Sequence, residues 1–315
     1  MQTRQLGKNG QHLTILGFGS WALGGSWQWG WGKADDKESV EAIQTALESG
    51  VNWIDTAAVY GFGHSEKIVA ESVKGFREKI FIATKCGLVN DGKNNAVNDN
   101  SPENIRKEVE ASLKNLNTDY IDLYQIHWPD PAVDVERSWE TMAALKAEGK
   151  VKYIGVSNFN IDLLERCMKI EQVQSLQPPY SMLRRDYEKE VLPYCLENEI
   201  GVVAYSPMQA GLLTGEFNIN KLAEDDWRRK DKMFNEPYLV QALDFVEHLK
   251  PLASKNNITV GQLALAWVLN NPAVTSAIVG ARNKRQSAQN FSINSLKLSP
   301  EDIASLAGEM KKRGL

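Results

Sequence analysis

Cysteine and histidine are scarce in this sequence, with 3 cysteines and 4 histidines in 315 residues. Cys86, Cys167 and Cys195 lie far apart and form no C-x-x-C pair, which argues against a disulfide framework and against a structural zinc site. The histidines form no H-E-x-x-H motif, so we expect no metal site. Isolated cysteines also fit a reducing compartment, and we expect a cytoplasmic protein.

Long apolar runs and clusters of one charge are missing as well. No run approaches the roughly 20 apolar residues that span a bilayer, and the start, MQTRQLGKNGQHL, lacks the apolar core of a signal peptide. The 36 Lys and Arg residues are spread along the chain, and the formal net charge is −4. We therefore expect neither nucleic acid nor a membrane as a partner, and we expect a small-molecule ligand instead.

What the sequence does contain is an alternation of two kinds of segment. Helix-like segments, with apolar residues recurring every three or four positions, cover 35–50, 65–76, 101–116, 135–150, 161–170 and 186–199. Capping serines before proline at Ser101-Pro102 and Ser299-Pro300 predict helix starts. Strand-like, β-branched runs occur at 13–20, 51–55, 79–85, 120–127, 151–158, 173–177, 200–206 and 275–281.

Eight strand-like runs alternating with helices predict an α/β fold, and their number and spacing favour a closed (β/α)8 TIM barrel over an open doubly wound sheet. Residues 3–15 predict an N-terminal β-hairpin that caps the barrel bottom, with 13–20 serving both the hairpin and the barrel. Extra helices are expected near the C-terminus. We find no linker and predict a single domain over 1–315. The long segments 86–100 and 206–237 follow strands, where barrels usually bind ligands.

The segment G-F-G-S-W-A at 17–22 formally matches the dinucleotide fingerprint G-x-G-x-x-G/A. A Rossmann turn must open a helix, whereas a loop rich in Gly and Trp follows here. We interpret the segment as a strand end followed by an aromatic loop. Its tryptophans either pack locally or line a pocket, and their number favours a pocket: Trp21, Trp27, Trp29 and Trp31.

Residues with acid–base chemistry follow three of the predicted strands: Asp55, Tyr60, Lys85 and His127. The carboxyl ends of barrel strands meet at one mouth, so these side chains can converge. A buried Lys85 needs an anionic partner, which Asp55 can supply, and the Lys85 charge is expected to lower the pKa of Tyr60. As a neutral imidazole, His127 can orient a carbonyl, although a buried histidine bonded to the backbone is an equally good interpretation of this residue alone.

Six ordered motifs resemble the aldo-keto reductase superfamily: D-T-A-A-V-Y-G (55–61), I-A-T-K (82–85), D-Y-I-D-L-Y-Q-I-H-W (119–128), I-G-V-S-N-F (154–159), A-Y-S-P (204–207) with G-L-L-T-G (211–215), and V-G-A-R-N (279–283). The resemblance implies a (β/α)8 barrel that moves a hydride between NADPH and a carbonyl. It implies Tyr60 as general acid, Lys85 and Asp55 as the pair that tunes it, and His127 as the carbonyl-orienting group. The chain looks nearer the bacterial stress-protein-like branch than the mammalian aldose reductase branch.

The resemblance also implies an NADPH (NADP+) site. Ser157, Asn158 and Gln177 would bind the nicotinamide carboxamide, Tyr205 would stack on the ring, and Arg282 would clamp the 2′-phosphate. The other residues of this implied site are Gly19, Ser20, Trp21, Asp55, Ser206, Pro207, Gly211, Leu212, Leu213, Gly280, Gln286 and Asn290.

The chain departs from the best-known pattern near the phosphate. Gly280-Ala281 stands where that pattern has Lys-Ser, and Gln286 stands where it has Arg. The chain therefore has fewer cations near the 2′-phosphate, and a weaker preference for NADPH over NADH is expected. The carbonyl substrate is expected to contact Trp21, Tyr60, His127 and Trp128.

Two rival functions use some of the same residues. A Schiff-base barrel would use Lys85 or Lys152 as a neutral amine, but Asp55 beside Lys85 would keep that lysine charged. A regulatory or sensor subunit, like the channel-associated relatives of the family, would bind NADPH with little turnover. The intact group of four acid–base residues favours an enzyme.

Overall fold

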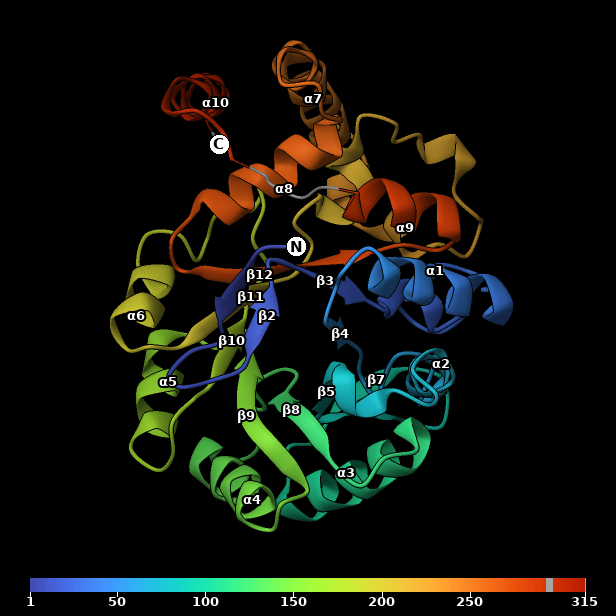
Figure 1. The fold of residues 1–315 in the computed structure, drawn as a ribbon, viewed down its shortest axis with the longest axis vertical. Helices are drawn as coiled ribbons and strands as arrows, with labels where there is room; N and C mark the ends of the chain where they lie inside the picture. Colours follow the sequence, from blue (N-terminus) through green and yellow to red (C-terminus); the bar gives the residue numbers. More distant parts are fainter. Residues whose placement is uncertain (293–296, 315) are drawn as a thin grey trace.

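Eight parallel strands close into a barrel in the computed structural model, which describes residues 1–292 and 297–314 (Figure 1). The chain closes the barrel by pairing its first barrel strand with its last, with Leu16 opposite Ala277 and Gly19 opposite Gly280. The prediction of a (β/α)8 barrel is confirmed. Around the barrel the strands are β3 (Leu16–Gly19), β4 (Trp53–Asp55), β5 (Phe81–Cys86), β8 (Ile121–Ile126), β9 (Val151–Ser157), β10 (Ser175–Gln177), β11 (Gly201–Ala204) and β12 (Val274–Gly280).

Helices between the strands form the outer ring: α1 (Asp36–Glu48), α2 (His64–Ser72), α3 (Pro102–Leu116), α4 (Val135–Ala147), α5 (Ile161–Met168), α6 (Val191–Glu197), α8 (Val260–Asn270) and α9 (Lys284–Phe291). The expected extra helices are α7 (Tyr238–Lys255) and α10 (Pro300–Lys312), which lie outside this ring (Figure 1). Ser101 and Ser299 cap α3 and α10 as predicted, each accepting a backbone N–H bond from the first turn.

One predicted helix begins later than the sequence suggested. The pattern over 186–199 predicted a continuous helix, but α6 starts at Val191. Residues 186–190 form turns instead. Pro193 lies in the first turn of α6, and in a longer helix its ring would clash with the carbonyl of residue 189, so the helix begins just before it. Glu188 in the preceding turns accepts a hydrogen bond from the Tyr180 hydroxyl at 3.1 Å.

The N-terminal hairpin closes one end of the barrel, as predicted. Strands β1 (Thr3–Gln5) and β2 (His12–Thr14) pair antiparallel, and the run 13–20 is indeed shared between β2 and β3. Leu6 and Leu13 are fully buried in one cluster with Trp53 of the barrel interior. The turn of the hairpin lies against the backbone at the amino ends of β10 and β11. The hairpin therefore covers the amino ends of the barrel strands.

Trp53 packs inside the barrel in a cluster with buried residues of other strands: Phe81, Ala83, Leu123, Val203 and Ile278. The Trp53 indole donates hydrogen bonds to Thr14 O and to Ser276 Oγ, both at 3.1 Å. Glycine at position 17 makes room for it, because a Cβ there would lie 2.0 Å from the Trp53 ring. The interior near the amino ends of the strands is therefore close-packed, which holds the strands firmly in position.

Three long segments surround the open mouth of the barrel. Residues 21–34 begin with a 3₁₀ turn at Trp21–Leu23, and 86–100 form a hairpin of β6 (Leu88–Asn90) and β7 (Ala96–Asn98). Residues 206–237 contain short 3₁₀ turns at Gln209–Thr214, Ile219–Lys221, Trp227–Lys230 and Lys232–Phe234, and one further 3₁₀ turn, Arg77–Lys79, precedes β5.

Two negative findings apply to residues 1–292 and 297–314. No helix among them is both long enough and apolar enough to cross a membrane. No group of three or more His, Cys, Asp or Glu side chains is placed there to hold a metal ion.

Candidate active site

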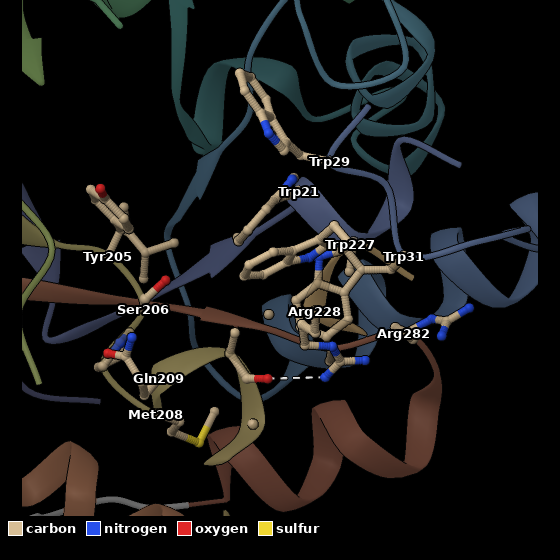
Figure 2. A pocket seen from close by; sticks show the side chains of 18 of the residues that line it. Trp21, Trp29, Trp31, Tyr205, Ser206, Met208, Gln209, Trp227, Arg228 and Arg282 are labelled. Atoms are coloured by element: carbon tan, nitrogen blue, oxygen red, sulfur yellow. Dashed lines mark hydrogen bonds between the residues drawn. The ribbon is translucent and has the colours of Figure 1, made fainter. Parts of the chain in front are cut away.

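A cavity of about 880 Å³ opens at the carboxyl ends of the barrel strands. Residues from all three long segments line it, including the tryptophans predicted to line a pocket (Figure 2). The sequence-predicted residues that line this cavity are Gly19, Trp21, Asp55, Tyr60, His127, Trp128, Ser157, Asn158, Gln177, Tyr205, Ser206, Pro207, Gly211, Gly280, Arg282, Gln286 and Asn290. Residues spread over most of the chain thus meet around one space.

Four predicted residues lie behind the cavity wall. Lys85 is beneath the floor, with 1% of its surface exposed. Ser20 is fully buried and donates a hydrogen bond to Asp55 O at 2.9 Å, so its side chain supports the strand end. The side chains of Leu212 and Leu213 pack in the core, which leaves only their backbone for contact with a ligand.

Lys85 and Asp55 form a buried ion pair at the floor of the cavity. The Lys85 ammonium donates to both carboxylate oxygens of Asp55, at 2.9 and 2.8 Å, and to Thr56 O at 2.8 Å. Gln177 Nε2 donates to Asp55 Oδ1 at 2.8 Å. Burial raises the pKa of Asp55 and lowers the pKa of Lys85, and the attraction between the two charges opposes both shifts.

Tyr60 lies above this pair, with its hydroxyl 3.4 Å from Lys85 Nζ. From the sequence, the Lys85 charge was expected to lower the pKa of Tyr60, and that expectation is wrong for this structure. Burial, followed by the negative charge of Asp55, raises the pKa of Tyr60 well above its usual value. Because Asp55 neutralises much of the Lys85 charge, burial decides the direction. The phenol is therefore protonated at neutral pH and can donate a proton.

His127 completes the acid–base group on the side of β8. Its ring meets the Tyr60 ring edge-on, with the ring centroids 5.8 Å apart. Burial and the Lys85 charge lower the pKa of His127 well below its usual value, so the imidazole is neutral. A neutral imidazole beside a phenol can hydrogen-bond to a carbonyl oxygen.

Next to this group, the residues predicted to hold a carboxamide form one hydrogen-bonded network. The Tyr205 hydroxyl donates to Asn158 Oδ1 at 2.9 Å, and Asn158 Nδ2 donates to His127 O at 3.0 Å and to Ser157 Oγ at 2.9 Å. Ser157 Oγ donates to Gln177 O at 2.8 Å. Polar groups from β9, β10 and the end of β11 are thus fixed relative to one another.

Arg228 and Arg282 lie at the end of the cavity away from Tyr205 (Figure 2). Lys221 and Arg285 also line the cavity, as do the acidic residues Glu216 and Asp231. The guanidinium of Arg282 donates to Lys33 O at 3.0 Å, while its backbone N–H donates to Gln286 Oε1 at 2.9 Å. Asn290 Nδ2 donates to Gly280 O at 3.1 Å. This end can hold an anionic group such as a phosphate.

Two residues that line the cavity, Trp227 and Arg228, were not predicted from the sequence, although their segment, 206–237, was predicted to bind a ligand. The Trp227 and Trp21 rings are 5.3 Å apart, and Arg228 lies 4.0 Å over the Trp31 ring (Figure 2). Arg228 is also paired with the buried Asp226 and donates to Ala210 O at 3.0 Å. An aromatic residue followed by two arginines was the available signal, but it did not reveal the partner loop.

A second missed group lies on the side of Tyr60 and His127. Leu88, Ala96 and Asn98, from the β6–β7 hairpin, line the cavity. The Ala96 N–H donates to Gln28 Oε1 at 2.6 Å, which fastens the hairpin to the tryptophan-rich loop. The segment 86–100 was predicted as a long loop, and nothing in its polar sequence indicated a hairpin over the mouth.

Comparison with known proteins gives one consistent family. The sequence profile of the Aldo/keto reductase family matches residues 15–308. Aldo-keto reductase YhdN of Bacillus subtilis is 39% identical over 307 residues, which cover 96% of this chain and 91% of that protein. The NADH-specific methylglyoxal reductase of Escherichia coli is 36% identical over 324 residues, covering 98% of each. The structure of the glycerol dehydrogenase AKR11B4 from Gluconobacter oxydans superimposes with a TM-score of 0.88 at 35% identity, covering 99% of this chain and 95% of that one.

Proposed function

We propose a reaction for this chain, which belongs to the aldo/keto reductase family of oxidoreductases. The reaction is the reduction of an aldehyde or ketone to an alcohol with NADPH, and Tyr60 supplies the proton. The observation that carries the proposal is the protonated, buried phenol of Tyr60, 3.4 Å from the ammonium of a buried ion pair and beside a neutral imidazole.

The residues of the cavity fit a nicotinamide dinucleotide. Its floor has the polar network of Ser157, Asn158 and Gln177 near the acid–base group, and Arg228 and Arg282 lie at its other end (Figure 2). Gly19 and Gly280 are paired between β3 and β12 and line the cavity without side chains, so their backbone is open to a ligand. When bound, the reduced cofactor supplies the hydride for the carbonyl carbon.

The chain's own residues then handle the oxygen of the carbonyl. Tyr60 donates its proton to that oxygen, and His127 holds the oxygen with a hydrogen bond from its neutral ring. Lys85 lies close enough to stabilise the phenolate that is left, and Asp55 keeps the ammonium in place. The tryptophans around the mouth limit the access of water to this group.

Two relatives suggest which carbonyls to test first. One is named a methylglyoxal reductase and the other a glycerol dehydrogenase, so we propose small oxygen-rich carbonyl compounds as substrates. The first of these names also specifies NADH. We base the preference for NADPH on the cations at the far end of the cavity, and Arg282→Ala is expected to narrow the NADPH to NADH ratio of kcat/KM.

The test is a panel of carbonyl compounds with NADPH and with NADH, followed by the absorbance of the reduced nicotinamide. Tyr60→Phe is expected to lower kcat by a factor of about 10² or more and to leave cofactor affinity nearly unchanged, because only the proton donor is lost. Tyr120→Phe, at the opposite end of the barrel, is the matched control. Steady-state turnover that survives in Tyr60→Phe would contradict the role of Tyr60. Oxidation of bound NADPH in a single turnover, without steady-state activity, would instead indicate a sensor subunit.

A further inference from the structure

We propose that Asn98 determines substrate specificity, because its Oδ1 accepts a hydrogen bond from a hydroxyl group on the carbon next to the substrate carbonyl. This inference rests on the proposed function and deepens it by naming the substrate class. The favoured substrates are 2-hydroxy aldehydes and 2-hydroxy ketones. Dicarbonyl compounds are disfavoured, since their second oxygen has no hydrogen to donate.

Asn98 lies on the face of the β6–β7 hairpin that is turned toward the cavity. It is paired across the hairpin with Leu88, and cross-strand partners project from the same face. Both residues line the cavity. The middle pair of the hairpin, Val89 and Val97, alternates to the other face, where Val97 is 43% exposed.

This face of the hairpin lies beside the acid–base group. Leu88 packs in one hydrophobic cluster with Tyr60. On the other side, the Asn98 amide bonds to Pro129 O, two residues after His127. Asn98 is therefore placed where it faces the carbon next to a carbonyl held by Tyr60 and His127.

The direction of the Asn98 amide follows from its neighbour. Pro129 O is a backbone carbonyl and can only accept, so the amide nitrogen of Asn98 faces it, at 3.1 Å. The amide oxygen points away from Pro129, and no donor in the described part of the chain is bonded to it. Because Asn98 lines the cavity, this oxygen is available to a ligand.

Hydrogen bonds on two sides hold the hairpin that carries Asn98. The Ala96 N–H donates to Gln28 Oε1 at 2.6 Å, and Asn100 Nδ2 donates to Trp128 O at 2.8 Å. The hairpin is thus fastened both to the tryptophan-rich loop and to the segment that follows β8. Asn98 offers its oxygen from a fixed position.

The rest of this wall offers a substrate hydroxyl no other side-chain acceptor. The wall is formed by residues 21–34, 86–100 and Trp128, and apart from Asn98 its cavity-lining side chains are indoles or alkyl groups: Trp21, Ala22, Trp27, Trp29, Trp31, Leu88, Ala96 and Trp128. An indole N–H donates a hydrogen bond but does not accept one. On this wall a substrate hydroxyl therefore finds a partner for its hydrogen in Asn98, whereas a ketone oxygen at the same place would meet the lone pairs of Oδ1.

Lactaldehyde and methylglyoxal are a matched pair of test substrates. They share one carbon skeleton and one aldehyde group, and they differ in the oxygen at C2, which is a hydroxyl in lactaldehyde and a ketone in methylglyoxal. In Asn98→Leu, kcat/KM for lactaldehyde is expected to fall about five- to tenfold, the effect of one net hydrogen bond, while kcat/KM for methylglyoxal changes by about twofold or less. The measurement is the initial rate at the absorbance of the reduced nicotinamide. The unequal intrinsic reactivity of the two compounds cancels when their ratio is compared between wild type and variant.

Two further variants control the experiment. Asn98→Asp also loses the hydrogen bond to Pro129 O but keeps acceptor oxygens, so it should keep the wild-type ratio to within about twofold. Val97→Ala changes the other face of the hairpin and should leave both rate constants unchanged.

The outcomes are distinct. A ratio that Asn98→Leu leaves unchanged, including an equal loss for both compounds, would overturn the role of Asn98. The same change of ratio in Asn98→Asp as in Asn98→Leu would assign the effect to the Pro129 bond and would overturn that role as well. Wild-type protein that reduces other carbonyl compounds but neither of these two would also overturn it. Wild-type protein that reduces no carbonyl compound with either cofactor would instead refute the proposed function itself.

Discussion

Glu108 has a buried carboxyl on α3, next to the end of strand β5, which carries Lys85. Its Oε2 accepts hydrogen bonds from Gly87 N–H at 2.7 Å and from Asn104 Nδ2 at 2.8 Å. Burial raises its pKa from 4.5 to about 8, since these two bonds do not offset the loss of water, and nearby Glu66 and Asp99 add to the increase. We expect Glu108→Gln to remove a pH dependence of stability.

The size of this effect follows from proton binding. Between pH 4.5 and about 8 the folded protein keeps the Glu108 proton, whereas the unfolded chain loses it. The free energy of unfolding therefore falls as the pH rises, by about 1.4 kcal/mol per pH unit and by roughly 5 kcal/mol over the whole window. Below pH 4.5 Glu108 is protonated in both the folded and the unfolded chain, so this stability is fully present there. The amide introduced by Glu108→Gln is neutral at every pH and has the shape of the protonated acid, so the variant has no such slope.

The assay is urea unfolding of the wild type and of Glu108→Gln at several values between pH 5 and pH 8. The free energy of unfolding of the variant, relative to that of the wild type, should rise with each unit of pH, by roughly 3 kcal/mol between pH 5 and pH 7. Glu103→Gln, an exposed acid on the same helix, should run parallel to the wild type. A constant difference between wild type and Glu108→Gln across the range would show that the folded carboxyl is already ionised, and the reasoning would be refuted.

Two further substitutions test the support of the site. Lys85→Met leaves the buried Asp55 carboxylate without its partner, and we expect it to lower the free energy of unfolding in urea at pH 7 by about 3–5 kcal/mol. A double variant with Asp55→Asn should recover part of this loss, and purely additive effects of the two substitutions would contradict this cause. Gly17→Ala places a Cβ 2.0 Å from the Trp53 ring and should lower the free energy of unfolding by about 1–3 kcal/mol. Gly308→Ala lies in α10 with no atom within 4 Å of its Cβ and should raise stability slightly, so similar Tm values for the two variants would argue against the packing of Trp53 on Gly17.

The parts of the fold that sequence predicts best depend on local patterns repeated along the chain. The strand-like runs at 51–55 and 120–127 end at Asp55 and His127, and parallel closure brings these ends to the same mouth without any contact having to be known in advance. Ser101 and Ser299 show the same principle, since a helix cap depends on only a few neighbouring residues. For this reason the fold and the convergence of the acid–base residues could both be predicted.

What could not be predicted depends on contacts between distant loops. Trp227 and Arg228 meet Trp21 and Trp31 across some 200 positions, and no periodicity in either loop encodes that meeting. The prediction of a lowered Tyr60 pKa was wrong for a related reason. Its neighbouring charges are evident from the sequence, whereas the extent of its burial depends on how the whole mouth is packed.

The gathering of tryptophans around the cavity has an optical consequence. Of the 9 tryptophans in the chain, 6 line this one space: Trp21, Trp27, Trp29, Trp31, Trp128 and Trp227. Indole emission overlaps the absorption band of a reduced dihydropyridine, so a reduced cofactor seated there would quench most of the protein's ultraviolet fluorescence and emit in the blue. The oxidised form would produce no blue emission, and the protein would thereby report the redox state of its own ligand without an added dye.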